Sequence, residues 1–144
     1  MSRGPGAASD QVSVLIVEDE ILIGLGLALA LNVAGYRALG PAGSVARALS
    51  LAAQERAEIA LVDIDLHGRP DGIDVARVLA ERHGTTVVFV TGAPDKARQA
   101  RDCALGVITK PYDLVEIPRV IETAKRYRIT GQIDEPPCLL ELFV

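Results

Sequence analysis

Five short runs rich in valine, isoleucine and leucine alternate with five segments of helical periodicity along this chain. The runs that predict strands span residues 12–17, 37–39, 59–62, 86–90 and 106–109. A helical segment follows each of them, at about residues 20–34, 45–52, 73–80, 94–104 and 114–127. This alternation predicts an α/β fold, a doubly wound five-stranded parallel sheet with helices on both faces.

The flavodoxin-like strand order 2-1-3-4-5 is the order expected for five such strands. In this arrangement ligands bind beyond the carboxyl ends of the strands, beside the switch point between the first and third. Polar side chains that directly follow these strands are therefore the first candidates for a functional site.

Charge and length exclude two classes of function. The formal net charge is −4, from 19 acidic and 15 basic residues that are spread along 144 positions, so direct binding to nucleic acid is not expected. Residues 21–36 carry no charge, but these 16 residues fall short of the roughly 20 that span a membrane. We expect a buried helix there and no membrane association.

Domain boundaries follow from the same patterns. Residues 1–11 are small and polar and predict a disordered leader rather than a signal peptide. Residues 12–128 form the predicted domain, and residues 129–144 form a C-terminal extension. Cys103 and Cys138 lack metal-ligand or disulfide-framework spacing, which predicts free thiols and a cytoplasmic location.

Polar residues follow four of the predicted strands. Glu18 and Asp19 follow the first strand, Asp63 the third, Thr91 the fourth and Lys110 the fifth. Each alone is explained as a helix cap or a solvated surface residue. Together they place three carboxylates, a hydroxyl and an ammonium group at one edge of the sheet, which predicts a functional site.

Three neighbouring carboxylates raise one another's pKa unless a cation lies between them. Mg²⁺ suits such a site because it binds through one or two carboxylates, water and a substrate phosphate. An aspartate can act as a nucleophile that forms an aspartyl-phosphate, while the metal and a lysine neutralise the phosphoryl oxygens. The residue types therefore favour phosphoryl transfer with Mg²⁺ as cofactor.

Over residues 12–127 the chain resembles the receiver domains of two-component response regulators. The motifs that carry the resemblance are Val17-Glu-Asp-Glu20, Leu61-Val-Asp-Ile-Asp-Leu66, Asp71-Gly72, Val90-Thr-Gly92 and Lys110-Pro-Tyr112. The segment Phe89-Val-Thr-Gly92 further resembles a receiver subgroup marked by Phe-Ala-Thr-Gly.

The resemblance implies a role for each matching residue. It implies that Asp63 is the phosphoacceptor, that Thr91 is the switch hydroxyl and that Lys110 contacts the phosphoryl group. The implied metal ligands are Glu18, Asp19, Asp63 and the main-chain carbonyl of Asp65.

The resemblance also implies partners: a sensor histidine kinase or phosphotransfer protein, a downstream effector, and a second copy of the chain in a homodimer. The exposed side of the first helix helps to dock the kinase in such proteins, and here this helix is uncharged. Tolerance of apolar residues at the surface is the plain alternative. Such a domain catalyses only its own phosphorylation and dephosphorylation, so we do not expect an enzyme.

Two positions depart from the family pattern. Val107 stands where most receivers carry a tyrosine or phenylalanine whose rotation reports phosphorylation. Pro118 lies inside the expected last helix, so that helix either starts late or kinks. The missing aromatic keeps open a phosphorylation-independent interaction module. The Asp63-Ile-Asp65 motif keeps open an aspartate-nucleophile phosphatase, although its place on the third strand disfavours that class.

The last seven residues, Cys138-Leu-Leu-Glu-Leu-Phe-Val144, are apolar at six positions. Burying each leucine or phenylalanine is worth roughly 1.5–3 kcal/mol, so we expect this tail to dock. Its target is either a groove on its own domain or, as we favour, the face of a second copy formed by the fourth helix, fifth strand and fifth helix. A frayed terminus is the plain alternative.

Overall fold

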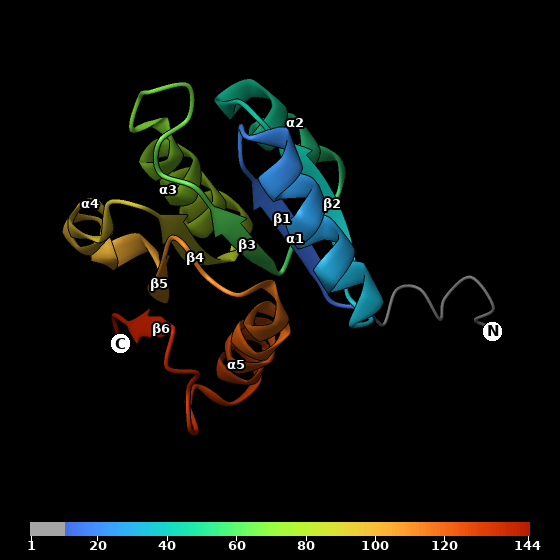
Figure 1. Ribbon diagram of the computed structural model, residues 1–144, viewed down its shortest axis with the longest axis vertical. Coiled ribbons are helices and arrows are strands. Elements are labelled where there is room, and N and C mark those ends of the chain that lie inside the picture. The colour runs from blue at the N-terminus through green and yellow to red at the C-terminus, as the bar shows by residue number, and fades with distance from the viewer. Residues whose placement is uncertain (1–10) are drawn as a thin grey trace, which may run out of the picture.

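The computed structural model describes residues 11–144, so the predicted leader lies outside the described residues except for Gln11. One six-stranded sheet runs through it in the order β2-β1-β3-β4-β5-β6 (Figure 1). The strands are β1 (Ser13–Val17), β2 (Arg37–Ala42), β3 (Ile59–Val62), β4 (Thr86–Thr91), β5 (Gly106–Thr109) and β6 (Leu140–Leu142). The helices are α1 (Ile21–Val33), α2 (Val45–Gln54), α3 (Asp71–His83), α4 (Pro94–Gln99) and α5 (Ile117–Thr130), with 3₁₀ turns η2 (Arg101–Cys103) and η3 (Leu114–Glu116).

The five parallel strands have the predicted order 2-1-3-4-5, which confirms the flavodoxin-like fold. Side chains alternate between two cores along each strand. In β1, Leu15 and Val17 pack toward α2, α3 and α4, whereas Val14 and Ile16 pack toward α1 and α5. The core strands are buried on both faces, as a parallel sheet under two helical layers requires.

The tail adds a sixth strand, β6, to the five predicted parallel strands. It pairs antiparallel with β5, in the register Gly106↔Leu142, Val107↔Glu141 and Ile108↔Leu140. The prediction that the tail docks is correct, but the favoured target, a second copy, is not what the structure shows. The β5 edge of the same domain lies within reach and supplies unpaired main-chain groups for the tail.

The boundaries of helix α4 and strand β2 also differ from the predicted ones. Helix α4 ends at Gln99 and gives way to the 3₁₀ turn η2 instead of continuing to residue 104. Strand β2 extends to Ala42 and includes Pro41, which an edge strand tolerates because it has an unpaired side.

Helix α5 starts late, which settles the two alternatives for Pro118. The Asp113 side chain accepts a hydrogen bond from the Val115 N–H at 3.0 Å and caps the 3₁₀ turn η3, not an α-helix. The α-helix begins only at Ile117, so Pro118 falls in its first turn, where an N–H would have no partner in the helix.

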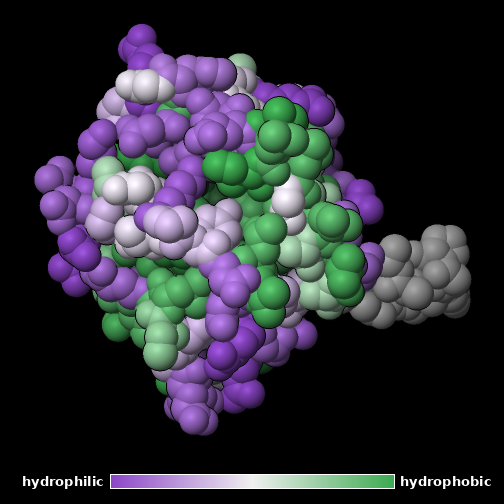
Figure 2. Space-filling model, viewed as in Figure 1, coloured by the Kyte–Doolittle hydropathy of each residue, from purple (hydrophilic) through white to green (hydrophobic). Residues whose placement is uncertain are grey.

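Helix α1 is not the buried helix that its lack of charge predicts. Of its residues only Gly24, Leu27 and Leu31 are buried, while Leu22 is 81% and Val33 79% exposed. Figure 2 shows the resulting apolar band over α1. Among the described residues, no helix combines the length and apolarity needed to cross a membrane.

Candidate functional site

The residues predicted from the strand ends lie together at the carboxyl edge of the sheet. Glu18 and Asp19 follow β1, Asp63 follows β3, Thr91 ends β4 and Lys110 follows β5. Parallel pairing of β1, β3, β4 and β5 brings these ends into one row. The strand pairing therefore places the groups as the sequence predicts.

Lys110 joins two of the carboxylates. Its Nζ donates hydrogen bonds to Glu18 Oε1 and to Asp63 Oδ2, both at 3.0 Å. Burial lowers the pKa of Lys110, but the hydrogen bonds to the two carboxylates outweigh it and raise the pKa above its ordinary value. The ammonium group is therefore charged throughout the neutral range.

Glu18 is the most deeply placed acid of the site, with 3% of its surface exposed. Burial raises the pKa of Glu18 above its ordinary value, and the hydrogen bonds from Lys110 and from the Glu20 N–H oppose that rise only in part. A second positive charge near Glu18 would stabilise its ionised form.

Asp19 faces the loop after β3. Its Oδ2 accepts a hydrogen bond from the main-chain N–H of His67 at 2.8 Å. Burial raises the pKa of Asp19, but hydrogen bonds, that from His67 the strongest, outweigh burial and lower the pKa. The Asp19 carboxylate is therefore ionised at neutral pH.

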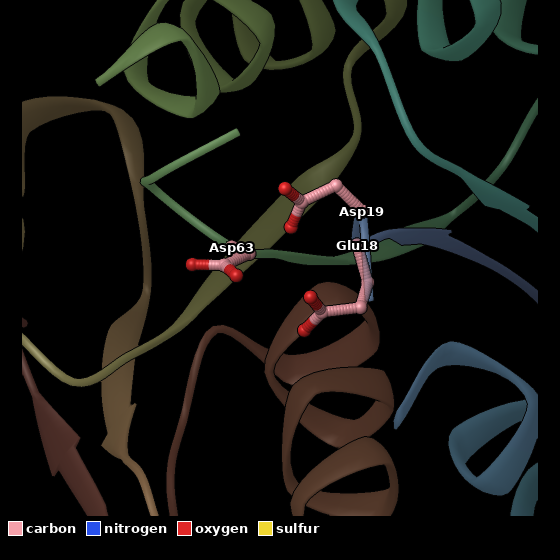
Figure 3. Close-up of side chains that lie close together, drawn as sticks. All are labelled: Glu18, Asp19 and Asp63. Carbon is pink, nitrogen blue, oxygen red and sulfur yellow. The ribbon is translucent and has the colours of Figure 1, made fainter. Parts of the chain in front are cut away.

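The three carboxylates fit a divalent cation. One oxygen from each of Glu18, Asp19 and Asp63 lies within 4.8 Å of the others, and Figure 3 shows the three groups around a common space. The cluster holds three acids, and Lys110 bonds only two of them, so carboxylates outnumber the ammonium group. Hard oxygen ligands with unbalanced charge are what Mg²⁺ prefers.

Thr91 is fully buried beside this cluster. Its Oγ1 accepts a hydrogen bond from the Ala93 N–H at 2.9 Å, directly before α4. Because the hydroxyl acts as an acceptor in this contact, its own proton remains available to donate.

The Asp65 carboxylate lies outside the cluster. Its side chain forms an ion pair with Lys96 of α4 at 3.1 Å, and its N–H donates to Asp63 Oδ1 at 3.2 Å. The role of the Asp65 carbonyl as a metal ligand stays a prediction. Sequence reasoning missed Lys96 because no motif marks it, and the pair becomes visible only once α4 is placed.

The side chain of His67 is exposed. What sequence reasoning missed is its main-chain role toward Asp19. The backbone at His67 has a positive φ of 53° and is followed by Gly68 at 77°. The glycine is the one signal in the sequence that marks this turn.

A doubly wound sheet with an acidic cluster, a threonine and a lysine at its carboxyl edge defines the receiver class of signalling domains. Residues 14–122 match the family model described as response regulator receiver domain. The chain belongs to this family.

Similar proteins agree with the assignment. The transcriptional regulatory protein PdtaR of Mycobacterium tuberculosis is 34% identical over 119 residues, which cover 80% of this chain and 58% of PdtaR. The chain thus spans little more than half the length of this curated relative.

Two solved structures show the same fold. The signal receiver domain of a modulated diguanylate cyclase from Desulfovibrio desulfuricans superposes with a TM-score of 0.76 at 32% identity, covering 85% of this chain and all (100%) of that one. The receiver domain of the Erythrobacter litoralis PhyR response regulator gives 0.74 at 26% identity, covering 91% and 98%.

Proposed function

We propose that this chain is a phosphoacceptor that takes a phosphoryl group on Asp63 from a histidine kinase or phosphotransfer protein in the cytoplasm, with Mg²⁺ bound. The phosphorylated domain then signals to an effector by protein contact. The observation that carries the proposal is the bridge of Lys110 between Glu18 and Asp63, beside the third carboxylate of Asp19.

The chain's own groups suit this reaction. Asp63 Oδ2 accepts a hydrogen bond from the Lys110 ammonium, and Oδ1 accepts one from the Asp65 N–H. The two contacts hold the nucleophile in one orientation. A carboxylate oxygen attacks phosphorus, and the bond to the donor nitrogen breaks with its electron pair leaving on that nitrogen. Lys110 and the Thr91 hydroxyl stabilise the oxygens of the transferred group.

Glu18, Asp19, Asp63 and the Asp65 carbonyl would hold the metal. When bound, Mg²⁺ supplies positive charge that neutralises the phosphoryl oxygens. We propose no other catalytic activity: the chain catalyses only its own phosphorylation and dephosphorylation. An aspartate-nucleophile phosphatase would need the Asp65 carboxylate as an acid, and its pairing with Lys96 does not favour that role.

The apolar band of α1 supports a docking role for the phosphodonor. A groove of about 420 Å³ lies between α1 and the segment after β5, and its lining includes Leu22, Tyr112 and Leu114. Lys110 also borders this groove, so a helical donor seated there would place its histidine near Asp63. An apolar contact of this kind adds affinity roughly in proportion to the area it buries.

Labelling with a radioactive phosphodonor tests the proposal. An aspartyl-phosphate hydrolyses in both acid and base. The Asp63→Asn variant should lose this labile phosphate, whereas Asp65→Asn should keep it. The second variant is the matched control because it removes the neighbouring carboxylate that could compete as acceptor. Wild-type labelling in Asp63→Asn would contradict the proposal, and rapid turnover of many phosphoesters would favour the phosphatase.

A further inference from the structure

The tail strand β6 is attached to the rest of the domain through a small contact. Three residue pairs join it to β5, and the Phe143 N–H donates to the Leu105 carbonyl at 2.8 Å. Leu140 packs into the core on the α5 side, whereas Phe143 packs against the core on the α4 side. The tail therefore touches both helical layers at the β5 edge of the sheet (Figure 1).

Gly106 makes the close approach of the tail possible. A Cβ at this position would overlap the Glu141 carbonyl, and the nearest atoms around it all belong to Leu140 and Glu141. The absent side chain thus serves the strand that lies beside β5. This is the property of an edge shaped to receive another strand.

Helix α4 connects this edge to the phosphoacceptor site. Before its first turn, the Ala93 N–H bonds to Thr91. On one side Lys96 pairs with Asp65, and on the other Arg98 donates from Nε and Nη2 to both carboxylate oxygens of Glu141 at 2.8 Å. A helix of 6 residues therefore holds a contact to the site and a contact to the tail at once.

Two features of the tail would favour its local release from the domain. The Arg98 to Glu141 pair is exposed on both sides, and such pairs contribute little to stability. Leu140 is the one residue of β6 that is buried. Segments with few buried contacts open locally while the rest of the structure stays folded.

We propose that the β5 edge is a strand-binding surface that the chain's own tail occupies, and that phosphorylation of Asp63 loosens the tail and opens this edge to an extended segment of a partner. The proposal rests on the proposed function of Asp63. It also answers how a receiver with Val107 in place of an aromatic can report phosphorylation, since Val107 pairs with Glu141 of the tail.

The physical route runs through α4. A phosphoryl group on Asp63 accepts a hydrogen bond from the Thr91 hydroxyl, and the shift of Thr91 moves the Ala93 N–H that is bonded to it. Arg98 moves with α4 and loses its two-point contact with Glu141. The vacated edge then presents the β5 main chain, Gly106 and Arg98, which fit a segment of alternating apolar and acidic residues.

Amide hydrogen exchange measured by NMR on the full chain tests the coupling. With Mg²⁺ and beryllofluoride, which mimics the phosphoryl group, the Phe143 amide should exchange at least about 5-fold faster, a coupling of typical size. The Thr86 amide, which donates to the Glu58 carbonyl at 2.9 Å, reports whether the sheet stays closed and should not change. Asp63→Asn should show no acceleration.

Failure of this proposal is distinguishable from failure of the proposed function. If Asp63 accepts phosphate from a donor but the Phe143 amide is unaffected by beryllofluoride, the coupling is refuted and the phosphoacceptor role stands. If Asp63 accepts no phosphate, both are refuted.

Substitution of Gly106 provides a second test that needs no phosphorylation. Gly106→Ala should accelerate exchange at Phe143 without beryllofluoride, because the added Cβ displaces the tail. By reciprocity it should also tighten beryllofluoride binding by roughly 5-fold or more. Gly26→Ala on α1, where a Cβ meets only the Leu114 side chain at 3.3 Å, is the matched control. Unchanged beryllofluoride affinity in a Gly106→Ala protein with a freed tail would overturn the proposal.

A peptide covering residues 137–144 tests the surface itself. In the full-length Glu141→Arg chain, repulsion from Arg98 should free the edge, and the wild-type peptide should bind there, as measured by fluorescence anisotropy. The same peptide with arginine at the position of Glu141 should bind at least about 5-fold more weakly. If both peptides bind equally well, or if neither binds, the β5 edge is not a strand-binding surface that selects an acidic residue opposite Arg98.

Discussion

The carboxylate site and the tail strand are both held by lysine or arginine contacts to acids, yet they differ in burial. Lys110 contacts Glu18 and Asp63 where both acids are nearly covered. Arg98 contacts Glu141 where both side chains are open to water. The first contact sits between core strands and tolerates little change, whereas the second can break at low cost. The molecule thus joins a rigid chemical site to a marginally held edge.

The largest effect is expected where the buried contact is removed. Lys110→Met takes the ammonium away from Asp63, and we expect phosphorylation to slow by on the order of 100-fold, as when one stabilising donor is lost from an active site. The initial rate of label incorporation measures it. Lys125→Met, on α5, is the control and should label at the wild-type rate. If Lys110→Met labels at the wild-type rate, the buried Lys110 contact is not needed for phosphorylation, and the contrast with the exposed Arg98 contact fails.

Two glycines offer a matched comparison of the regions. A Cβ at Gly72 would overlap the Asp63 carbonyl and the Ile64 main chain, which cannot leave. Gly72→Ala should therefore lower the free energy of unfolding by roughly 1–3 kcal/mol, as overpacking does. Gly106→Ala should lower it less, because the tail that it meets can detach. Urea denaturation of both variants measures the difference, and equal losses would mean that β6 is part of the core.

The smallest effect is expected for acid. The hydrogen bond from Arg98 lowers the pKa of Glu141 below its ordinary value of 4.5. A lowered pKa in the folded state means that the contact stabilises the docked tail above that value and is lost as the pH falls through the lowered pKa. Exchange at the Phe143 amide should therefore rise modestly in acid relative to the Thr86 amide. The Glu141→Gln variant should lack this added dependence, and an identical profile would show that the pair does not hold the tail.

Much of the fold and site could be predicted because the relevant signals are local. Four of the five apolar runs are directly followed by polar residues of the site, and parallel pairing alone brings Asp19, Asp63 and Lys110 together. The periodicity of the runs also fixes which side chains of β1 face each helical layer. These features depend only on the order of residues along the chain.

What could not be predicted depends on which distant segments meet. The sequence of residues 138–144 predicts that the tail docks, but not that it pairs with β5 of its own domain. The hydrophobic effect is not directional, so apolar residues do not specify the surface they bind. Likewise nothing near Lys96 or Arg98 indicates Asp65 or Glu141 as a partner. A proline at position 118 is compatible with either a late helix start or a kink. The 3₁₀ turn capped by Asp113 delays the start of α5.

The proline in β2 has a consequence for assembly. Pro41 has no N–H to offer, and it lies on the strand at the opposite edge of the sheet from β6. That edge is a poor template for another chain. If β6 leaves, the sheet formed by residues 11–144 therefore has one adhesive edge, not two. Pairing of two vacated β5 edges with each other would stop at a closed dimer, since the growth of a fibre through sheet edges requires a second edge on every unit.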